Sequence, residues 1–256
     1  MKDFVIKLLT ATPNQTYLFS AGQAGFILKS KNGQLLGIDL YLSECVERLE
    51  GNKGFKRLLP KIMNPFDIAF DCLITTHPHW DHFDVDAIPS MMSNEKTKLF
   101  ASVDCRKEVV RLGMKDERVA YVKPGNTCVC GDFTIDFINC DHGTGAPDAF
   151  GVIITVDGKK ICMVGDTCLR LDRVEEYLSK GSLDVLVGPI NGAFGNLNER
   201  DFATLSNKLT PKLTIPCHYG MFASHGGNPG CFYKIMTEEC PHLPFALLCM
   251  GEGIVL

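Results

Sequence analysis

Residues 73–84, LITTHPHWDHFD, place three histidines and two aspartates in one short segment of a chain that has only 7 histidines among its 256 residues. The segment begins with an apolar run bounded by polar residues, which is typical of a buried strand. Imidazole nitrogens and carboxylate oxygens are ligands that zinc, manganese and iron accept. A loop at the end of a strand can present several such side chains to one point, so the segment indicates a metal site.

The remaining ligand-type residues follow the same rule. The alternative interpretation of residues 73–84 is a solvated histidine-rich loop, which would not require the other histidines to follow strands. However, His142 in NCDHGTG, Asp166 in MVGDTC and His218 in IPCHYG each follow an apolar run that we predict to be a strand. The candidate ligands are enough for two metal sites. They are His77, His79, Asp81, His82, His142, Asp166 and His218.

A pattern of strands followed by helices occurs twice along the chain. The first half predicts strands over 17–22, 24–30, 35–40 and 71–77, then helices over 84–92 and 104–114, the second with Asp104 as its N-cap. After a turn at 122–127, the second half predicts strands over 133–138, 151–156, 159–166, 183–190 and 213–218, and helices over 169–181, 199–209 and 229–240. Residues 133–138 alternate apolar and polar side chains, the period of a strand with one buried face. The repeat favours two packed sheets with helices outside, and a single mixed α+β sheet is the alternative.

Charge and composition exclude several classes of protein. The formal net charge is −4, with no run of basic residues, so nucleic-acid binding is not expected. No stretch approaches the roughly 18 apolar residues of a membrane span, and Asp3 and Lys7 interrupt any apolar signal core. The 12 cysteines lie singly in apolar runs, as buried free thiols do. We expect one cytoplasmic domain, residues 1–256, that binds a small molecule and no membrane; homo-oligomerisation stays open.

The segment THPHWDH resembles the HxHxDH signature of the metallo-β-lactamase superfamily, and His142, Asp166 and His218 follow in that family's order. Within the superfamily, three segments resemble the L-ascorbate-6-phosphate lactonase group: MNPFDIAFDCLITTHPHWDHFDVDAI, VKPGNT and IPCHYGMFASHGGNP. The resemblance implies an α/β fold of α+β type, the αββα four-layer sandwich. It extends over residues 15–235.

The resemblance also implies a ligand set and a reaction. Two divalent metal ions, Zn²⁺ or Mn²⁺, are expected: one on His77, His79 and His142, the other on Asp81, His82 and His218, with Asp166 bridging. The implied activity is hydrolysis by a metal-bound hydroxide, which Asp81 orients before it passes a proton to the leaving oxygen. Oxygen-reducing members of the superfamily carry an acidic residue where this chain has His79.

Three functions remain open at this point. The resemblance favours a lactonase acting on a small polar or phosphorylated sugar-like lactone. A phosphodiesterase of the same fold is the first alternative, because the same hydroxide attacks phosphorus. A non-catalytic metal-binding protein is the second, and a complete ligand set speaks against it.

Residues outside the ligand set supply candidate substrate contacts. They are Asn191 after a predicted strand, Tyr219 beside a ligand, and His225 in the loop SHGGNPG. Adjacent glycines in that loop expose backbone N–H groups, a geometry that binds anions, so we expect an anionic substrate. The structural alternatives are a turn for Asn191, core packing for Tyr219 and a surface loop for His225. Asp39 is expected to hydrogen-bond the metal-binding loop, and Trp80 to be a pocket wall or a core anchor.

Overall fold

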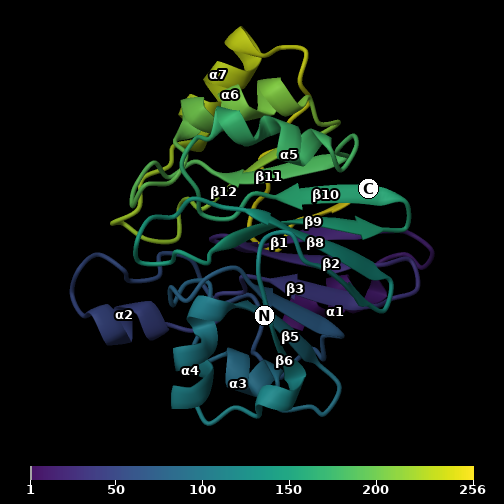
Figure 1. Ribbon diagram of the computed structural model, residues 1–256, viewed down its shortest axis with the longest axis vertical. Helices are drawn as coiled ribbons and strands as arrows, with labels where there is room; N and C mark the ends of the chain where they lie inside the picture. The colour runs from purple at the N-terminus through teal and green to yellow at the C-terminus, as the bar shows by residue number, and fades with distance from the viewer. Residues whose placement is uncertain (1) are drawn as a thin grey trace.

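The computed structural model describes residues 2–256, and its strands form two sheets that pack face to face (Figure 1). The first sheet has the order β13 (Gly253–Val255), β1 (Tyr17–Gly22), β2 (Gly25–Lys29), β3 (Leu35–Ile38), β4 (Cys72–Thr75), β5 (Lys98–Ser102), β6 (Val119–Val122). The second has the order β12 (Thr214–Cys217), β11 (Val185–Pro189), β10 (Lys159–Met163), β9 (Phe150–Val156), β8 (Phe133–Asn139), β7 (Thr127–Cys130).

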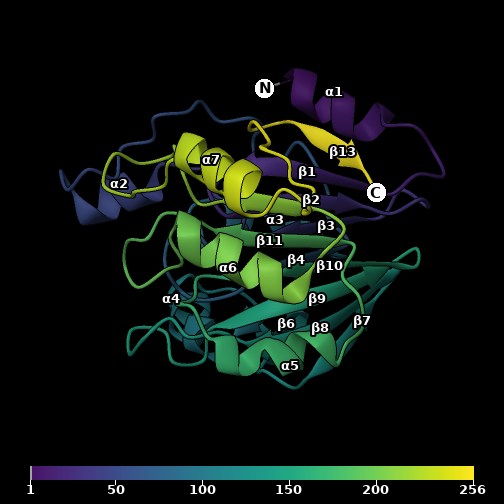
Figure 2. The same cartoon turned by 90° about the horizontal axis from the view of Figure 1, so that it is seen from above.

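Helices cover the outer face of each sheet (Figures 1 and 2). The first sheet carries α1 (Lys2–Thr10), α2 (Cys45–Glu50), α3 (Ile88–Met91) and α4 (Arg106–Arg111). The second carries α5 (Val174–Leu178), α6 (Glu199–Leu209) and α7 (Pro229–Glu239). Short 3-10 turns lie at Val103–Cys105, Asp116–Arg118 and Leu171–Arg173. The layers confirm the predicted αββα sandwich and exclude the single mixed sheet.

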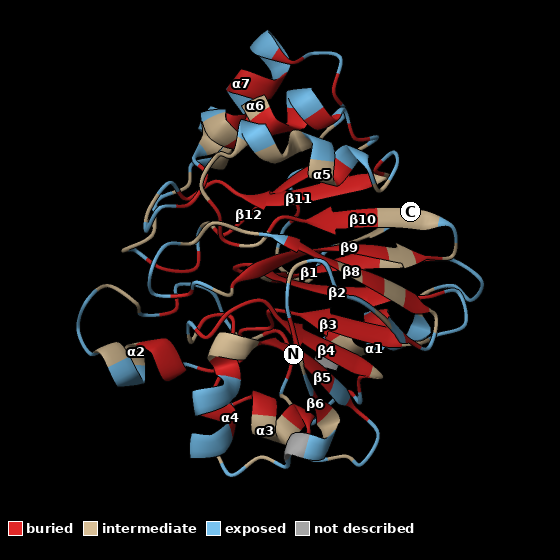
Figure 3. Ribbon diagram, in the orientation of Figure 1, coloured by how far each residue is buried: buried red, intermediate tan, exposed pale blue. Residues whose placement is uncertain are grey.

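Three apolar clusters hold these layers together. The middle cluster lies between the sheets, where Phe133, Ile135 and Phe137 of β8 are buried while Thr134 and Asp136 are partly exposed. This is the predicted period of two, and it arises because only one face of the strand meets the facing sheet. The outer clusters join each sheet to its helices. Figure 3 accordingly shows strands that are buried along most of their length and helices that are buried on one side.

The direction of the strands indicates at which edge of the sheets the candidate site lies. Strands β3 to β6 run parallel to one another, as do β10 to β12, whereas the hairpins β1–β2 and β8–β9 are antiparallel. Parallel neighbours need crossover connections, which explains why helices follow these strands. Their carboxyl ends meet at one edge of each sheet, where a site can form.

Several local predictions were wrong. Asp104 is not the N-cap: its N–H donates to the Ser102 side chain at 3.2 Å, and a 3-10 turn precedes α4. The helix predicted over 84–92 begins only at Ile88, because the Asp84 carboxylate binds the N–H groups of Leu42 (2.8 Å) and Ala87 (3.0 Å) and holds a turn instead.

Both ends of the described chain add elements that were not predicted. Helix α1 packs Phe4 and Leu8 into the first outer cluster. The buried Lys29 ammonium donates to the carbonyl oxygens of Leu8 (2.8 Å) and Ala11 (3.3 Å), where cationic side chains are favoured at a helix C-terminus. Strand β13 returns from the second half of the chain to pair with β1.

Two expectations from composition agree with the described chain. No helix within residues 2–256 is both long and apolar enough to cross a bilayer. All the cysteines are free thiols, and most are buried.

Candidate metal centre

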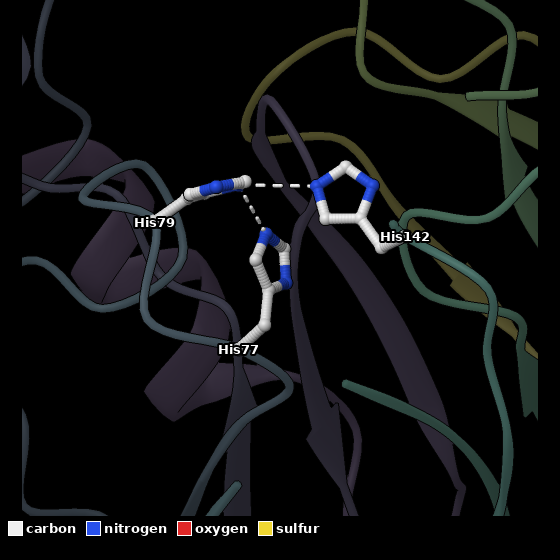
Figure 4. A group of neighbouring side chains, drawn as sticks. All are labelled: His77, His79 and His142. Carbon is white, nitrogen blue, oxygen red and sulfur yellow. Dashed lines mark hydrogen bonds between the residues drawn. The ribbon is translucent and has the colours of Figure 1, made fainter. Parts of the chain in front are cut away.

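Three histidine rings point toward one another near the ends of β4 and β8 (Figure 4). The Nδ1 atom of His79 lies 2.9 Å from Nε2 of His77 and 3.1 Å from Nε2 of His142. A neutral imidazole offers one donor and one acceptor nitrogen, so nitrogens that face one point repel unless a proton or cation lies among them. This first group therefore fits a divalent cation.

A second group lies beside the first. The Nε2 atoms of His82 and His218 are 3.3 Å apart, and the Asp81 Oδ2 atom lies 3.4 Å from the His218 nitrogen and 3.6 Å from that of His82. The ligand atoms within each group all lie within 4.8 Å of one another. The two groups correspond to the two sets implied by the sequence resemblance.

Asp166 lies between the groups. Its Oδ2 atom is 3.2 Å from His218 Nε2 and 3.4 Å from His82 Nε2, and 3.9 Å from His142 Nε2 in the first group. Within the described chain, the candidate ligands are thus brought together as predicted, and Asp166 lies where a bridging carboxylate would be. That they bind metal, and how many ions, stays a prediction.

Backbone conformation at two turns aims the side chains inward. His218 directly follows β12 and has a positive φ of 62°, which is unusual for a residue with a side chain. Its N–H donates to the Gln23 carbonyl oxygen at 2.9 Å, and Gln23 in the β1–β2 turn also has a positive φ of 54°. The two sheets are therefore joined at this point by the backbone of the site itself.

Asp39 supports the metal-binding loop, as predicted. Its Oδ2 atom lies 2.9 Å from His82 Nδ1 and accepts from the Thr76 hydroxyl at 2.7 Å, while Oδ1 accepts from the Thr76 N–H at 2.8 Å. A carboxylate at Nδ1 favours the tautomer with Nε2 free to bind a metal. Asp39 thereby orients His82 toward the centre of its group.

Two amide side chains at the site were not identified from the sequence. Gln23 Nε2 donates to Asp81 Oδ2 at 2.9 Å, and Asn196 Nδ2 donates to Asp166 Oδ2 at 2.8 Å. Each amide holds a carboxylate of the site by a hydrogen bond. A glutamine between glycines in the segment AGQAG is the signal that could have drawn attention to Gln23.

Charges within the cluster of candidate ligands shift the pKa values in opposite directions. Burial disfavours the charged form of His218, but Asp166 and Asp81 outweigh burial and raise its pKa to about 9. The pKa of His82 is also raised: burial opposes ionisation, but the same carboxylates outweigh it. Burial disfavours ionised Asp166 and Asp81 as well, but His218 and His82 lower both carboxyl pKa values well below the usual range.

The first group behaves differently. Desolvation by burial lowers the pKa of His142 to about 4, and burial likewise lowers the pKa values of His77 and His79. These rings are neutral near pH 7 and need lose no proton to bind a metal. The second group must lose protons to do so.

Binding of Zn²⁺ to the metal-free protein is therefore expected to release protons from His82 and His218 at neutral pH. Because the pKa of His218 is raised to about 9, the charged form dominates below that pH, and acid opposes metal binding. The apparent affinity should strengthen roughly tenfold per pH unit for each proton displaced, between about pH 6 and pH 8. Calorimetric titrations in buffers of different ionisation enthalpy count those protons, and an affinity independent of pH would contradict the assignment.

A pocket of about 410 Å³ opens onto the cluster. The candidate ligands His79, Asp81, His142 and Asp166 line it, and Trp80 lines it as well, so Trp80 forms a pocket wall as one of its two predicted roles. A pocket of this size fits a small molecule.

The predicted substrate contacts lie at different places. His225 lines the pocket, with its Nε2 atom 4.0 Å from Asp81 Oδ2. Asn191 is buried and accepts from Asn196 Nδ2 at 3.2 Å, so it reaches the site through that amide. Tyr219 packs against the cluster between the second sheet and its helices. A contact of any of them with substrate stays a prediction.

The surroundings of His225 disfavour a charged imidazole. Burial, together with His218, lowers the pKa of His225 to about 4, so the ring is neutral near pH 7. The glycines beside it have a packing role. A Cβ atom on Gly226 would lie 2.3 Å from the Asn191 carbonyl oxygen, and one on Gly227 would lie 2.6 Å from Tyr219 Cβ.

Known proteins resemble this chain in sequence and structure. A family profile described as "Beta-lactamase superfamily domain" matches residues 17–218. A UPF0173 metal-dependent hydrolase of Anaeromyxobacter dehalogenans (strain 2CP-C) is 28% identical over 222 residues, which are 81% of this chain and 76% of the relative. A probable L-ascorbate-6-phosphate lactonase of Salmonella heidelberg (strain SL476) is 21% identical over 259 residues, 85% of this chain and 73% of the relative. The crystal structure of a possible metal-dependent hydrolase from Veillonella parvula DSM 2008 superposes with a TM-score of 0.75 at 19% identity, over 94% of this chain and 100% of that one.

Proposed function

We propose that this chain, which belongs to the metallo-β-lactamase superfamily and is a metal-dependent hydrolase, is a lactonase that opens a small cyclic ester. The observation that carries the proposal is the position of the carboxylate of Asp81, which borders both the ligand cluster and the pocket. The relative described as a probable lactonase supports the choice of reaction.

The proposal assigns two ions to the ligand groups. His77, His79 and His142 would hold one, and Asp81, His82 and His218 would hold the other. Asp166, which lies near both groups, would contribute to both. Such ions supply positive charge that polarises the ester carbonyl and lowers the pKa of the attacking water. Zinc and manganese both suit this set of imidazole and carboxylate ligands.

The chain's own residues orient the reactants and move the proton. The Asp81 carboxylate, fixed by the Gln23 amide at 2.9 Å, accepts a hydrogen bond from the attacking water at the pocket floor. As the water oxygen bonds to the carbonyl carbon, Asp81 takes a proton from that water. It then passes this proton to the ring oxygen as the acyl–oxygen bond breaks. In a lactone that oxygen stays tethered to the acyl group, so a single compact pocket serves both ends of the breaking bond.

Apart from the two proposed ions, the pocket offers few cationic partners for a phosphodiester. Among the described residues that line it, Lys107 is the single Lys or Arg, and Glu50 and Glu108 are also present. Glu108 is paired with Arg111 at 2.6 Å. A phosphodiester carries a full negative charge, and cationic side chains or backbone donors usually hold it. An uncharged ring ester needs no such partners.

Protein loaded separately with Zn²⁺ and Mn²⁺ is expected to hydrolyse lactones with a kcat/KM roughly a hundredfold above that for phosphodiesters or thioesters, a ratio that reflects differential transition-state binding. The measurement is a panel of unsubstituted, alkyl, phenyl and phosphorylated lactones beside an aryl phosphodiester and an acyl thioester. Chelator-treated protein is the control and should be inactive. If the phosphodiester were hydrolysed faster than the lactones, the lactonase proposal would be wrong and a phosphodiesterase would be the better assignment.

A further inference from the structure

Phe194 is a large apolar side chain exposed to 60% at the pocket. Its φ of 56° lies in the left-handed region, which is unfavourable for a residue with a side chain. Its loop is closed by hydrogen bonds from Gly192 N–H to the Leu197 oxygen and from Asn196 N–H to the Ala193 oxygen, each 3.0 Å. Residues in sparsely populated backbone conformations cluster at ligand sites, and Gln23 and His218 at this site also have positive φ.

Aromatic rings connect Phe194 to the metal site. Its ring centroid lies 5.0 Å from that of His225, and the His225 ring stacks on that of the candidate ligand His218 at 5.0 Å and 27°. Phe55 lies 6.4 Å from Phe194, inclined at 30°, and also lines the pocket. Trp80, which lies between two candidate ligands in the sequence, lines the same pocket.

We propose that Phe194, Phe55 and Trp80 form an aromatic subsite that selects substrates carrying an apolar, preferably aromatic, substituent on the ring to be hydrolysed. The inference rests on the proposed function for the nature of that ring, and it commits to one occupant, the substituent of the substrate. A flat ring entering the pocket contacts the aromatic faces, whose pairwise attraction adds to the burial of apolar surface. The reacting ester then lies toward His79 and Asp81, at the metal side of the same pocket.

The subsite is an alternative to the anion-binding loop that the sequence predicts. His225 is the residue of that loop that lines the pocket, whereas Gly226 and Gly227 are packed against Asn191 and Tyr219. The anionic-substrate prediction therefore expects a phosphorylated ligand to bind more tightly, whereas the aromatic subsite expects a phenyl-substituted ligand to bind more tightly. A single set of ligands can separate them.

Trp80 makes the test direct, because it is the only tryptophan of the chain and lines the pocket. Unreactive γ-lactams serve as probes for the metal-loaded protein: unsubstituted, phenyl-substituted and phosphorylated. Binding is followed by Trp80 fluorescence and, independently of that residue, by calorimetry. The phenyl-substituted lactam should bind the wild-type protein more tightly than the other two.

Phe194→Ala is the decisive variant. Since the side chain is largely exposed, its removal should leave the fold intact. We expect roughly tenfold weaker binding of the phenyl lactam, with binding of the unsubstituted lactam changed less than about twofold. Phe194→Tyr keeps the ring and should retain the preference. Phe66→Ala is the matched control, because Phe66 is 73% exposed and lies outside the residues that line the pocket.

The outcomes separate this inference from the proposed function. Equal changes for both lactams in Phe194→Ala, no change for either, or tighter binding of the phosphorylated lactam would overturn the aromatic subsite. Selective loss of phenyl lactam binding supports the subsite, even in a protein that hydrolyses no lactone, and only the lactonase proposal then fails. Hydrolysis of phenyl-substituted lactones without any dependence on residue 194 would leave the lactonase proposal standing and overturn the subsite.

Discussion

Replacing Asp166 by Asn is expected to reduce hydrolysis at least about a thousandfold, since a metal pair contributes several kcal/mol of transition-state stabilisation. The Asp166 Oδ2 atom lies within 3.9 Å of imidazole nitrogens from both ligand groups. An amide has nearly the same size but no charge to hold two cations near each other. The metal content should therefore fall from about two ions per chain to one or fewer.

Elemental analysis after gentle purification, together with kcat and KM, measures both effects. Asp184→Asn is the control, because that carboxylate accepts from the Lys160 N–H at 2.8 Å and is not one of the candidate ligands. If the wild-type protein binds only one ion per chain even after metal is added, the prediction of a two-ion site is wrong. Full activity of the Asp166→Asn variant would show that Asp166 does not bridge two ions.

Asp81→Asn is expected to lower turnover by at least about a hundredfold, the lower range for general acid–base catalysis. The Asn side chain can still contact Gln23, whose amide is 2.9 Å from the Asp81 Oδ2 atom, so the loop should keep its conformation. What is lost is the anion that orients the attacking water and carries the proton. Some loss of metal from the second group is also expected, because Asp81 belongs to it.

The two consequences of Asp81→Asn can be distinguished by titrating metal back. If saturating metal restores occupancy but not turnover, the defect is in the chemistry. Circular dichroism and the thermal midpoint check that the fold is intact. A variant that retained its metal and near-normal turnover would show that Asp81 has no catalytic role.

Local sequence identified many elements of the two β-rich halves, but β5 (Lys98–Ser102), β6 (Val119–Val122) and α2 (Cys45–Glu50) were not predicted. The alternation of residues 133–138 identified β8 and its buried face, because a strand places successive side chains on opposite faces. The turn at 122–127 marked where the chain leaves the first sheet at β6 and enters the second at β7. Helix boundaries were less predictable, since the side chains of Asp84 and Ser102 bind backbone groups in ways that depend on their neighbours.

The candidate ligands were also identifiable from sequence alone. His142, Asp166 and His218 follow strands of the second sheet that run in one direction and end at one edge, so their proximity could be anticipated. His77 follows β4 of the first sheet, and its approach to the other three depends on how the two sheets pack. The HxHxDH motif is specific because its spacing places several ligands on one loop. No long-range contact has to be known to recognise it.

The surroundings of those ligands were decided by tertiary structure. Gln23 and Asn196 reach the carboxylates of the site from 58 and 30 residues away along the chain. Phe55, Phe194 and His225 come from three separate loops that meet only when both sheets are packed together. Single residues in loops leave no periodic signal, and their partners depend on how the layers pack. The sequence alone therefore indicated the αββα fold, through the resemblance of its motifs, and the candidate metal ligands, whereas packing of the layers decided which side chains form the walls of the pocket.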